Sequence, residues 1–243
     1  MHTLLFTEVL NRLFAGPVTA LLALLHIHPN NPAAPIPDHV SMQILVVLIL
    51  TTLFVIIRAS LSVESPGALQ HSMEATQGFV GQLGKEIIGH DYERYLPYLI
   101  TLGLFILFSN MIGLIPGFGS PTASPVVPLG CAVVTWVYYQ YHGLRVNGPI
   151  GYLKHFMGPV WWLAILMFPI EVFSHLARLM SLTVRLYANI FAGEMVTLVF
   201  FSLIPILFPV LFMGLHVFFG TIQTYIFVLL AAVYLGEATA HEH

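Results

Sequence analysis

The chain has 243 residues, of which 58% are hydrophobic and only 8% charged, and its net charge is −3 with histidine neutral. Soluble domains carry about 25% charged residues, so most of this surface is predicted not to face water, and nothing in the charge favours nucleic-acid binding. The single cysteine, Cys131, excludes a disulfide framework and a multi-cysteine metal site.

The first 25 residues contain an acid, Glu8, and an asparagine, Asn11, and lack a basic stretch ahead of their apolar run. This pattern is not typical of a cleaved signal peptide. We expect a short interfacial or buried helix here, in a segment 1–40 on the outer side of the membrane. The whole chain, 1–243, is interpreted as one integral membrane domain without internal repeats.

Apolar runs at Gln43–Ile57, Tyr98–Ile115 and Val126–Tyr139 approach the length needed to cross a hydrocarbon core of about 30 Å. They predict a first span within 41–61 and a second and third span within 95–142. The segment 66–94 between them is polar and amphipathic, which predicts a helix on the membrane surface followed by a loop. Proline and glycine in Asn110–Pro121 predict the turn between the second and third spans.

Basic residues gather in the loops that follow the first and third spans, where Arg58, Lys85, Arg94, Arg145 and Lys154 lie. Cytoplasmic loops of membrane proteins carry an excess of lysine and arginine. We therefore expect an outer N-terminus and a cytoplasmic C-terminus.

The last region, 159–240, is predicted to form a long helical hairpin. No proline lies between Ile170 and Leu203, and Pro169 and Pro205 bracket that segment. Its 34 helical residues would extend about 51 Å, which fits a bilayer only at a tilt of roughly 50–55° or with a kink. The fold class is therefore an all-α integral membrane protein. It has about five membrane helices and an interfacial amphipathic helix, and the last two membrane helices form this steeply tilted hairpin.

A polar stripe follows the first hairpin helix. At 100° per residue, Glu171, Ser174, Arg178, Ser181 and Asn189 fall within about 40° of Arg185, and His175 lies wider. Ionisable groups at membrane depth cost at least about 2.5–3.5 kcal/mol each and normally face protein, water or each other. Ion pairs that hold helices together are one explanation. However, the stripe has two arginines and one acid, so an acidic partner from another subunit is the alternative for a buried Arg185.

A second polar group is expected beyond Arg185. Glu194 lies about 13 Å further along the helix and points away from the Arg185 face. His216 and Gln223 are seven residues apart, on one face of the second hairpin helix. A pair of Glu194 with His216 would pass protons near neutral pH, whereas His216 alone would be read as a packed core histidine. Glu194, His216, Gln223 and Asn189 would together form one half-channel. A second half-channel would contain Glu171, Ser174 and His175, and Arg185 would lie between the two.

Three stretches carry a resemblance to subunit a of F-type ATP synthases: Asn110–Thr122, Val184–Glu194 and Ile222–Ala238. The chain is similar to that family over nearly its whole length from the first span onward. The resemblance implies that Arg185 faces the carboxylate of each passing c subunit and lowers its proton affinity. It also implies that Asn189, Glu194, His216 and Gln223 line the outer half-channel, and that Glu171 and Ser174 line the cytoplasmic one. His175 and Arg178 are secondary candidates.

The resemblance further implies a non-catalytic channel subunit of a bacterial inner membrane, in contact with lipid, a c-subunit ring, peripheral stalk b subunits and the rest of the complex. We expect no cofactor, no metal and no nucleic acid, and no phosphate-binding loop is present. Many family members have an acid or asparagine shortly after the Pro121–Thr122 turn, where this chain offers Thr122 and Ser124. The sequence therefore does not mark the outer mouth of the half-channel with an acid at this position.

Four alternatives stay open at this point. Sodium is the alternative to the proton as the coupling ion. A stand-alone transporter would normally have internal repeats and broken helices, and an intramembrane protease using Ser174 and His175 would need an oxyanion-hole signature; neither feature is visible. The terminal Ala-His-Glu-His is expected to be a solvated tail, with metal binding as the alternative.

Overall fold

The structure is a computed structural model that describes residues 4–24, 26, 34–62, 66–89, 91–115, 117–157, 164–203 and 207–239. In these ranges all regular structure is helical. The long helices, in chain order, are α1 (Leu5–Leu24), α2 (Asp38–Ala59), α3 (Ala68–Ile87), α4 (Leu96–Met111), α5 (Val126–Met157), α6 (Ala164–Leu203) and α7 (Leu207–Thr239). Three short 3₁₀ helices accompany them, η1 (Tyr92–Arg94), η2 (Ile112–Leu114) and η3 (Pro121–Ala123).

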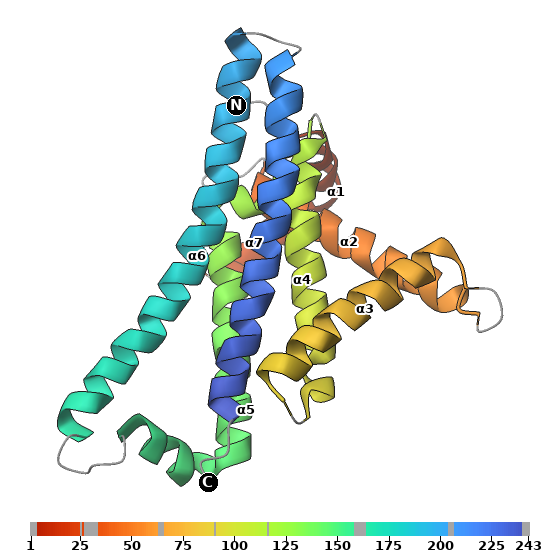
Figure 1. Cartoon of the computed structure of the whole chain (residues 1–243). Helices are drawn as coiled ribbons and strands as arrows, with labels where there is room; N and C mark the ends of the chain where they lie inside the picture. Colours follow the sequence, from red (N-terminus) through yellow and green to blue (C-terminus); the bar gives the residue numbers. More distant parts are fainter. Residues whose placement is uncertain are drawn as a thin grey trace. The chain divides into compact units, whose positions relative to one another are not determined.

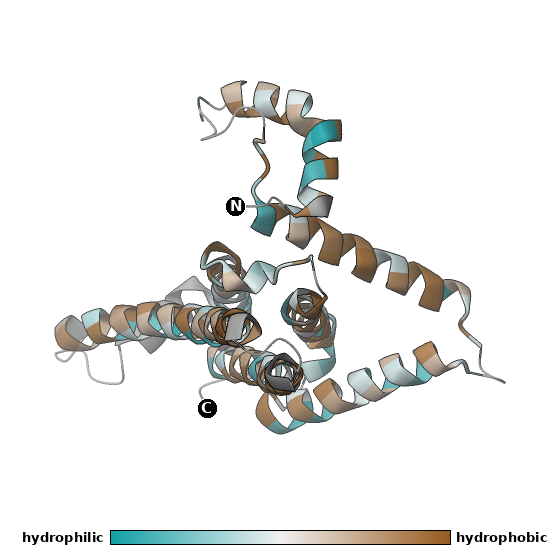
Figure 2. Cartoon of the chain, turned by 90° about the horizontal axis from the view of Figure 1, so that it is seen from above, coloured by the Kyte–Doolittle hydropathy of each residue, from teal (hydrophilic) through white to brown (hydrophobic). Residues whose placement is uncertain are grey.

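Within the described ranges, four segments are long and apolar enough to cross a membrane: Asp38–Ala59, Leu96–Leu114, Leu166–Phe201 and Val210–Thr239. The all-α integral membrane class is thereby confirmed. The expected third span forms the start of α5, which is not among the four because tyrosine, glutamine and histidine follow its apolar run at Tyr138–His142. Figure 2 shows α2 as hydrophobic along almost its whole length, whereas α3 carries hydrophilic and hydrophobic residues together.

The chain divides into two compact units. The first unit comprises Met1–Ala59, Leu104–Val127 and Ala188–Thr221. In it the amide of Asn11 in α1 donates to the carbonyl of Ile36 at 3.1 Å, and the Ile36 N–H returns a bond to Asn11 Oδ1 at 3.0 Å. The second half of α6 and the first half of α7 run side by side in this unit (Figure 1), with the rings of Phe200 and Phe212 stacked at 4.5 Å.

The second unit comprises Ser60–Gly103, Pro128–Tyr187 and Ile222–His243. Here α4 and α5 are joined by the stacked rings of Tyr98 and Tyr138, at 3.8 Å, and by a 2.8 Å hydrogen bond from the Tyr98 hydroxyl to Thr135. Helix α3 packs closely on α7, because a Cβ at Gly236 would lie 3.0 Å from the carbonyl oxygen of Ile87. A helix is thus present where an interfacial helix is predicted, while its place on the membrane surface stays a prediction.

Helix α6 starts earlier than the prolines suggest. Pro169 was expected to precede the helix, but α6 begins at Ala164 and contains it. Pro169 is the sixth residue of α6, just beyond the first four N–H groups that have no partner within a helix. It therefore removes one backbone hydrogen bond, the one from its own nitrogen to the carbonyl four residues earlier. The 40 residues of α6 would extend about 60 Å. The steep tilt remains a prediction, and the turn at Pro205 lies outside the described residues.

Helix α5 also continues further than expected. Arg145 and Lys154 were placed in a loop after the third span, but α5 extends to Met157. It bends at Gly148, whose φ of 69° and ψ of 164° are not helical. This conformation is almost restricted to glycine, and the proline that follows disfavours the helical conformation at Gly148. The bend explains why the sequence reads as a loop where the chain is helical on both sides.

Candidate functional site

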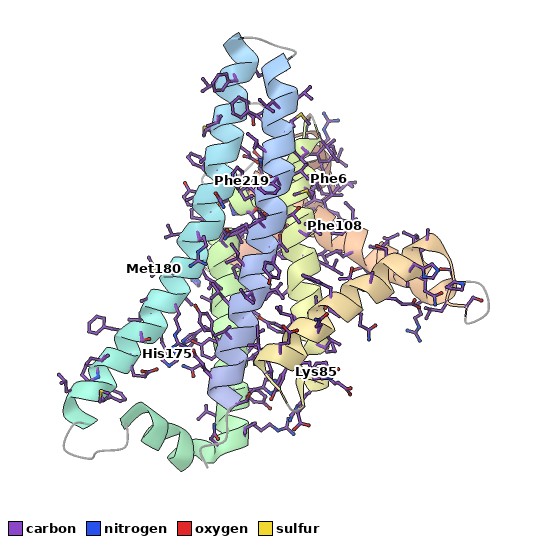
Figure 3. The ribbon with its side chains drawn as sticks, viewed as in Figure 1. Phe6, Lys85, Phe108, His175, Met180 and Phe219 are labelled. Atoms are coloured by element: carbon purple, nitrogen blue, oxygen red, sulfur yellow. The ribbon has the colours of Figure 1, made fainter. Side chains whose placement is uncertain are left out.

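In the second unit, the start of the polar stripe is a chain of three side chains. His175, labelled in Figure 3, is buried on α6, and its Nδ1 lies 2.8 Å from the hydroxyl of Tyr139 on α5. Its Nε2 lies 3.5 Å from Oε1 of Glu171, one turn earlier on α6. Tyrosine, histidine and glutamate can each donate and accept a proton. Ser174 lies on the same helix and is half-buried.

Arg178 is paired within the chain. Its Nη1 lies 2.5 Å from Oε2 of Glu237 on α7, and its guanidinium stands 4.9 Å from the ring centre of Tyr234. This partner was not predicted from the sequence, because Glu237 does not lie on the polar stripe of α6. Glu237 lies 59 positions away in sequence and becomes a neighbour of Arg178 only through helix packing.

Arg185 is in a different situation. It is exposed on α6, and its Nη2 donates a 3.0 Å hydrogen bond to Ser181 Oγ in the preceding turn. Among the described residues no carboxylate lies within ion-pair distance of it. The expectation that one arginine lacks an acidic partner in this chain therefore agrees with the geometry. Arg185 is exposed on α6, so this chain does not cover it, and its burial at membrane depth stays a prediction.

In the first unit, Asn110 at the end of α4 is the centre of a buried polar cluster. Its amide nitrogen donates to the carbonyl of Gly220 on α7 at 3.0 Å, and its Oδ1 accepts from the hydroxyl of Thr122 at 2.8 Å. Its backbone oxygen lies 3.2 Å from Nε2 of His216 and 3.4 Å from Oγ of Ser120. Asn110 and Thr122 are fully buried, so these bonds fix the orientation of the amide.

Glu194 and His216 take part in this cluster without forming a direct pair. Oε1 of Glu194 accepts a 3.0 Å bond from the backbone N–H of Ser120. His216 is buried and bonds to the backbone oxygen of Asn110. The expected carboxylate–imidazole contact is thus replaced, in the described part of the chain, by a path through Ser120 and Asn110. Each side chain bonds instead to a backbone group, Glu194 to the N–H of Ser120 in the turn after α4 and His216 to the carbonyl of Asn110 at the end of α4.

Two glycines leave the space that His216, Ser120 and Glu194 occupy. A Cβ at Gly193 would lie 3.1 Å from Nδ1 of His216. A Cβ at Gly113 would lie 2.0 Å from Oγ of Ser120 and 2.9 Å from Oε1 of Glu194. Any larger residue at Gly113 would therefore displace Ser120, Glu194 or both.

The remaining predicted residues lie on the same two helices. Asn189 is exposed on α6, in the first unit. Gln223 is buried on α7, with an exposed fraction of 2%, in the second unit. Asn110, Ser120 and Thr122 were not predicted as members of this polar cluster, in which Ser120 contacts Glu194, and Asn110 contacts His216 and Thr122. The motif Asn110–Thr122, which contains them, predicted a turn between two spans. It did not predict which residues of α6 and α7 they contact.

Comparison with known proteins bears on this arrangement. The ATP synthase A chain family model matches residues 40–236. The chain is 61% identical to the ATP synthase subunit a of Koribacter versatilis (strain Ellin345) over 242 residues, covering 100% of this chain and 99% of the relative. This chain belongs to the ATP synthase A chain family.

Other members of the ATP synthase A chain family are also similar over most of their length. The subunit a of Solibacter usitatus (strain Ellin6076) is 48% identical over 94% of this chain and 97% of the relative. Subunit a 1 of Syntrophotalea carbinolica (strain DSM 2380 / NBRC 103641 / GraBd1) is 42% identical over 84% and 87%. Arg185, Glu194 and His216 all lie within the range that the family model matches.

Proposed function

We propose that this chain is the proton-translocating stator subunit in the membrane sector of a rotary F-type ATP synthase. It conducts protons through two offset half-channels that are separated by Arg185, and it catalyses no reaction and needs no cofactor. Its partners are a ring of c subunits, the peripheral stalk b subunits and the rest of the complex. It lies in a bacterial inner membrane with its N-terminus outside and its C-terminus in the cytoplasm.

The observation that carries this proposal is the environment of Arg185. The guanidinium is exposed on α6 and has no carboxylate at ion-pair distance among the residues that the structure describes. The same helix exposes large apolar side chains, such as Phe173 at 71% and Met180 at 55% (Met180 is labelled in Figure 3). A cation at membrane depth requires a counter-charge or water. A carboxylate on a passing c subunit would supply that counter-charge.

Arginine suits this position because it stays protonated at any accessible pH and cannot itself pass a proton on. It therefore attracts an ionised rotor carboxylate and favours loss of the proton from it. It also prevents protons from crossing directly between the half-channels. Lysine would keep the charge but, when buried, can lose its proton.

The cluster around Asn110 supports an outer half-channel. Glu194 and His216 are proton carriers, and Ser120 has a hydroxyl that can act as donor and acceptor. The amide and backbone carbonyl of Asn110 orient these groups but cannot relay a proton. Transfer between Glu194 and His216 therefore needs water molecules or a direct approach of the two side chains. On the other side, Glu171, His175 and Tyr139 supply titratable groups for the cytoplasmic half-channel.

The test is Arg185→Ala in the complete ATP synthase, reconstituted into vesicles. We expect ATP-driven proton pumping and proton-driven ATP synthesis to fall to background, with the subunit still assembled in normal amounts. Arg185→Lys is the matched control that keeps a positive charge, and it should retain some binding of the rotor carboxylate but leak protons. Normal coupled pumping by Arg185→Ala would refute the proposal.

We further propose that the proton is the translocated ion. Pumping should then be independent of Na⁺ between nominally sodium-free buffer and high sodium, and a proton uncoupler should abolish the gradient. A pumping rate that rises in proportion to Na⁺ and resists the uncoupler would assign sodium instead.

A further inference from the structure

The ion pair between Arg178 and Glu237 raises a question about charge. Arg178 and Arg185 are seven residues apart on α6, which places them within about 20° of each other around the helix and about 10 Å apart along it. Both lie in the second unit. A carboxylate that approaches this face would therefore meet two cations in line, unless one of them is neutralised.

Among the residues that the structure describes, only Arg178 of the two arginines has an acidic partner. Glu237 holds the Arg178 guanidinium at 2.5 Å, and the face of the Tyr234 ring covers it at 4.9 Å. Arg178 is 26% exposed, whereas Arg185 lies exposed on the helix surface with Ser181 as its hydrogen-bond acceptor. The last turns of α7 thus neutralise one arginine of α6 and leave the other available.

From this geometry we infer that Glu237, supported by Tyr234, masks the charge of Arg178, so that the rotor carboxylate meets a single unpaired cation, Arg185. The inference rests on the proposed function. It makes Glu237 a positioning residue that determines which cation the rotor recognises, and it leaves Arg178 itself dispensable.

The consequence of unmasking Arg178 follows from its place on α6. Arg178 lies between Arg185 and the group of Glu171 and His175, on the side of the proposed cytoplasmic half-channel. An unmasked Arg178 would place a second unit charge about 10 Å from the rotor carboxylate. At an effective dielectric constant of about 20, this charge would strengthen the binding of the ionised carboxylate to α6 roughly tenfold. The carboxylate would then take up a proton from the cytoplasmic side less readily.

The experiment compares Glu237→Gln, Arg178→Gln and the double variant in the complete complex in inverted vesicles. For Glu237→Gln we expect ATP-driven pumping to fall about tenfold. After the soluble head is stripped, passive proton uptake from the cytoplasmic side should reach half-maximal rate at a pH about one unit lower. Arg178→Gln and the double variant should stay within about twofold of the parent, because neither has an unmasked cation.

Three controls separate masking from a simple loss of packing. Glu237→Asp keeps the negative charge and should restore most of the rate. Glu86→Gln removes an exposed acid on α3 and should leave the rate unchanged. The amount of subunit a in the membrane is measured for each variant, and rates are compared per assembled complex.

The outcomes are distinct. If the pair only ties α6 to α7, all three variants lose activity alike and the pH dependence does not move, which overturns the inference. Normal pumping by Glu237→Gln also overturns it, as does a loss with Arg178→Gln alone. Arg185→Ala, assayed in the same vesicles, tests the proposed function separately. If it pumps normally, that function fails; if it is inactive while Glu237→Gln is normal, only the masking fails.

Discussion

At the scale of single residues, the two nitrogens of His216 have different surroundings. Nε2 faces the backbone oxygen of Asn110 at 3.2 Å. A carbonyl oxygen can only accept, so Nε2 carries the hydrogen in this bond. In the proposed half-channel, Nδ1 would then be the nitrogen that takes up a proton. It lies directly against Gly193, where a Cβ would be 3.1 Å away.

We therefore predict that Gly193→Ala slows proton translocation about tenfold, because its methyl group pushes the imidazole out of position. The measurement is ATP-driven pumping per assembled complex. Gly214→Ala on α7 is the matched control, since a Cβ there meets nothing within 4 Å. Equal rates for the Gly193→Ala and Gly214→Ala variants would contradict the assigned role of Nδ1.

A second residue-scale prediction concerns Glu194→Gln and His216→Ala. Both remove a proton carrier from the proposed outer half-channel and leave Arg185 in place. We expect slower pumping, by about 10²–10⁴-fold where the lost group acts in acid–base transfer, with no rise in passive proton leak. Leak is measured as the decay of an imposed pH gradient in vesicles. An increased leak would mean that these residues help to separate the half-channels and do not lie within one of them.

At the scale of elements, the sequence predicted most of the helices because each has a strong signal. The apolar runs of α2 and α4 predict where these helices lie, and the proline and glycine residues after Met111 predict where α4 ends. The predicted start of α6 and the predicted end of α5 were wrong. Each depends on whether a helix continues through a single proline or glycine. Pro169 is tolerated near a helix start, and Gly148 bends a helix that continues on both sides.

The bend at Gly148 leads to an element-scale prediction. An L-residue at φ 69° and ψ 164° costs about 1–3 kcal/mol. Gly148→Ala should therefore straighten or destabilise α5 and lower the thermal inactivation temperature of the assembled complex. Gly130→Ala is the control on the same helix, because its Cβ would enter open space and alanine favours the helix by about 1 kcal/mol over glycine. Unchanged stability in Gly148→Ala would indicate that the bend is not required.

At the scale of the whole molecule, the candidate site could be predicted only in part. Arg185, Glu194 and His216 are identifiable from sequence because ionisable groups are rare in apolar helices. The partners of Glu194, His216 and Arg178 are not, since Ser120, Asn110 and Glu237 meet them through packing between distant segments. The ion pair of Arg178 is the clearest case: a count of charges on one helix cannot detect an acid that another helix supplies.

The orientation of the whole chain decides which half-channel faces which side of the membrane. The positive-inside rule predicts that the segment between α2 and α4, which contains Lys85 and Arg94, lies on the cytoplasmic side. The start of α6, with Glu171 and His175, would then lie on the cytoplasmic side, and the turn at Ser120 on the outer side. If the orientation were reversed, the same residues would serve the opposite half-channels.

We predict this orientation to be measurable with single cysteines in a Cys131→Ser background. Ser72→Cys lies exposed on α3 and Arg12→Cys lies exposed on α1. A membrane-impermeant thiol reagent should label Arg12→Cys in intact spheroplasts and Ser72→Cys only in inverted vesicles. Labelling in the reverse pattern would exchange the two half-channels, because Glu171 would then communicate with the outer side. Labelling of both from one side would contradict the single crossing of α2, the membrane helix between the two positions.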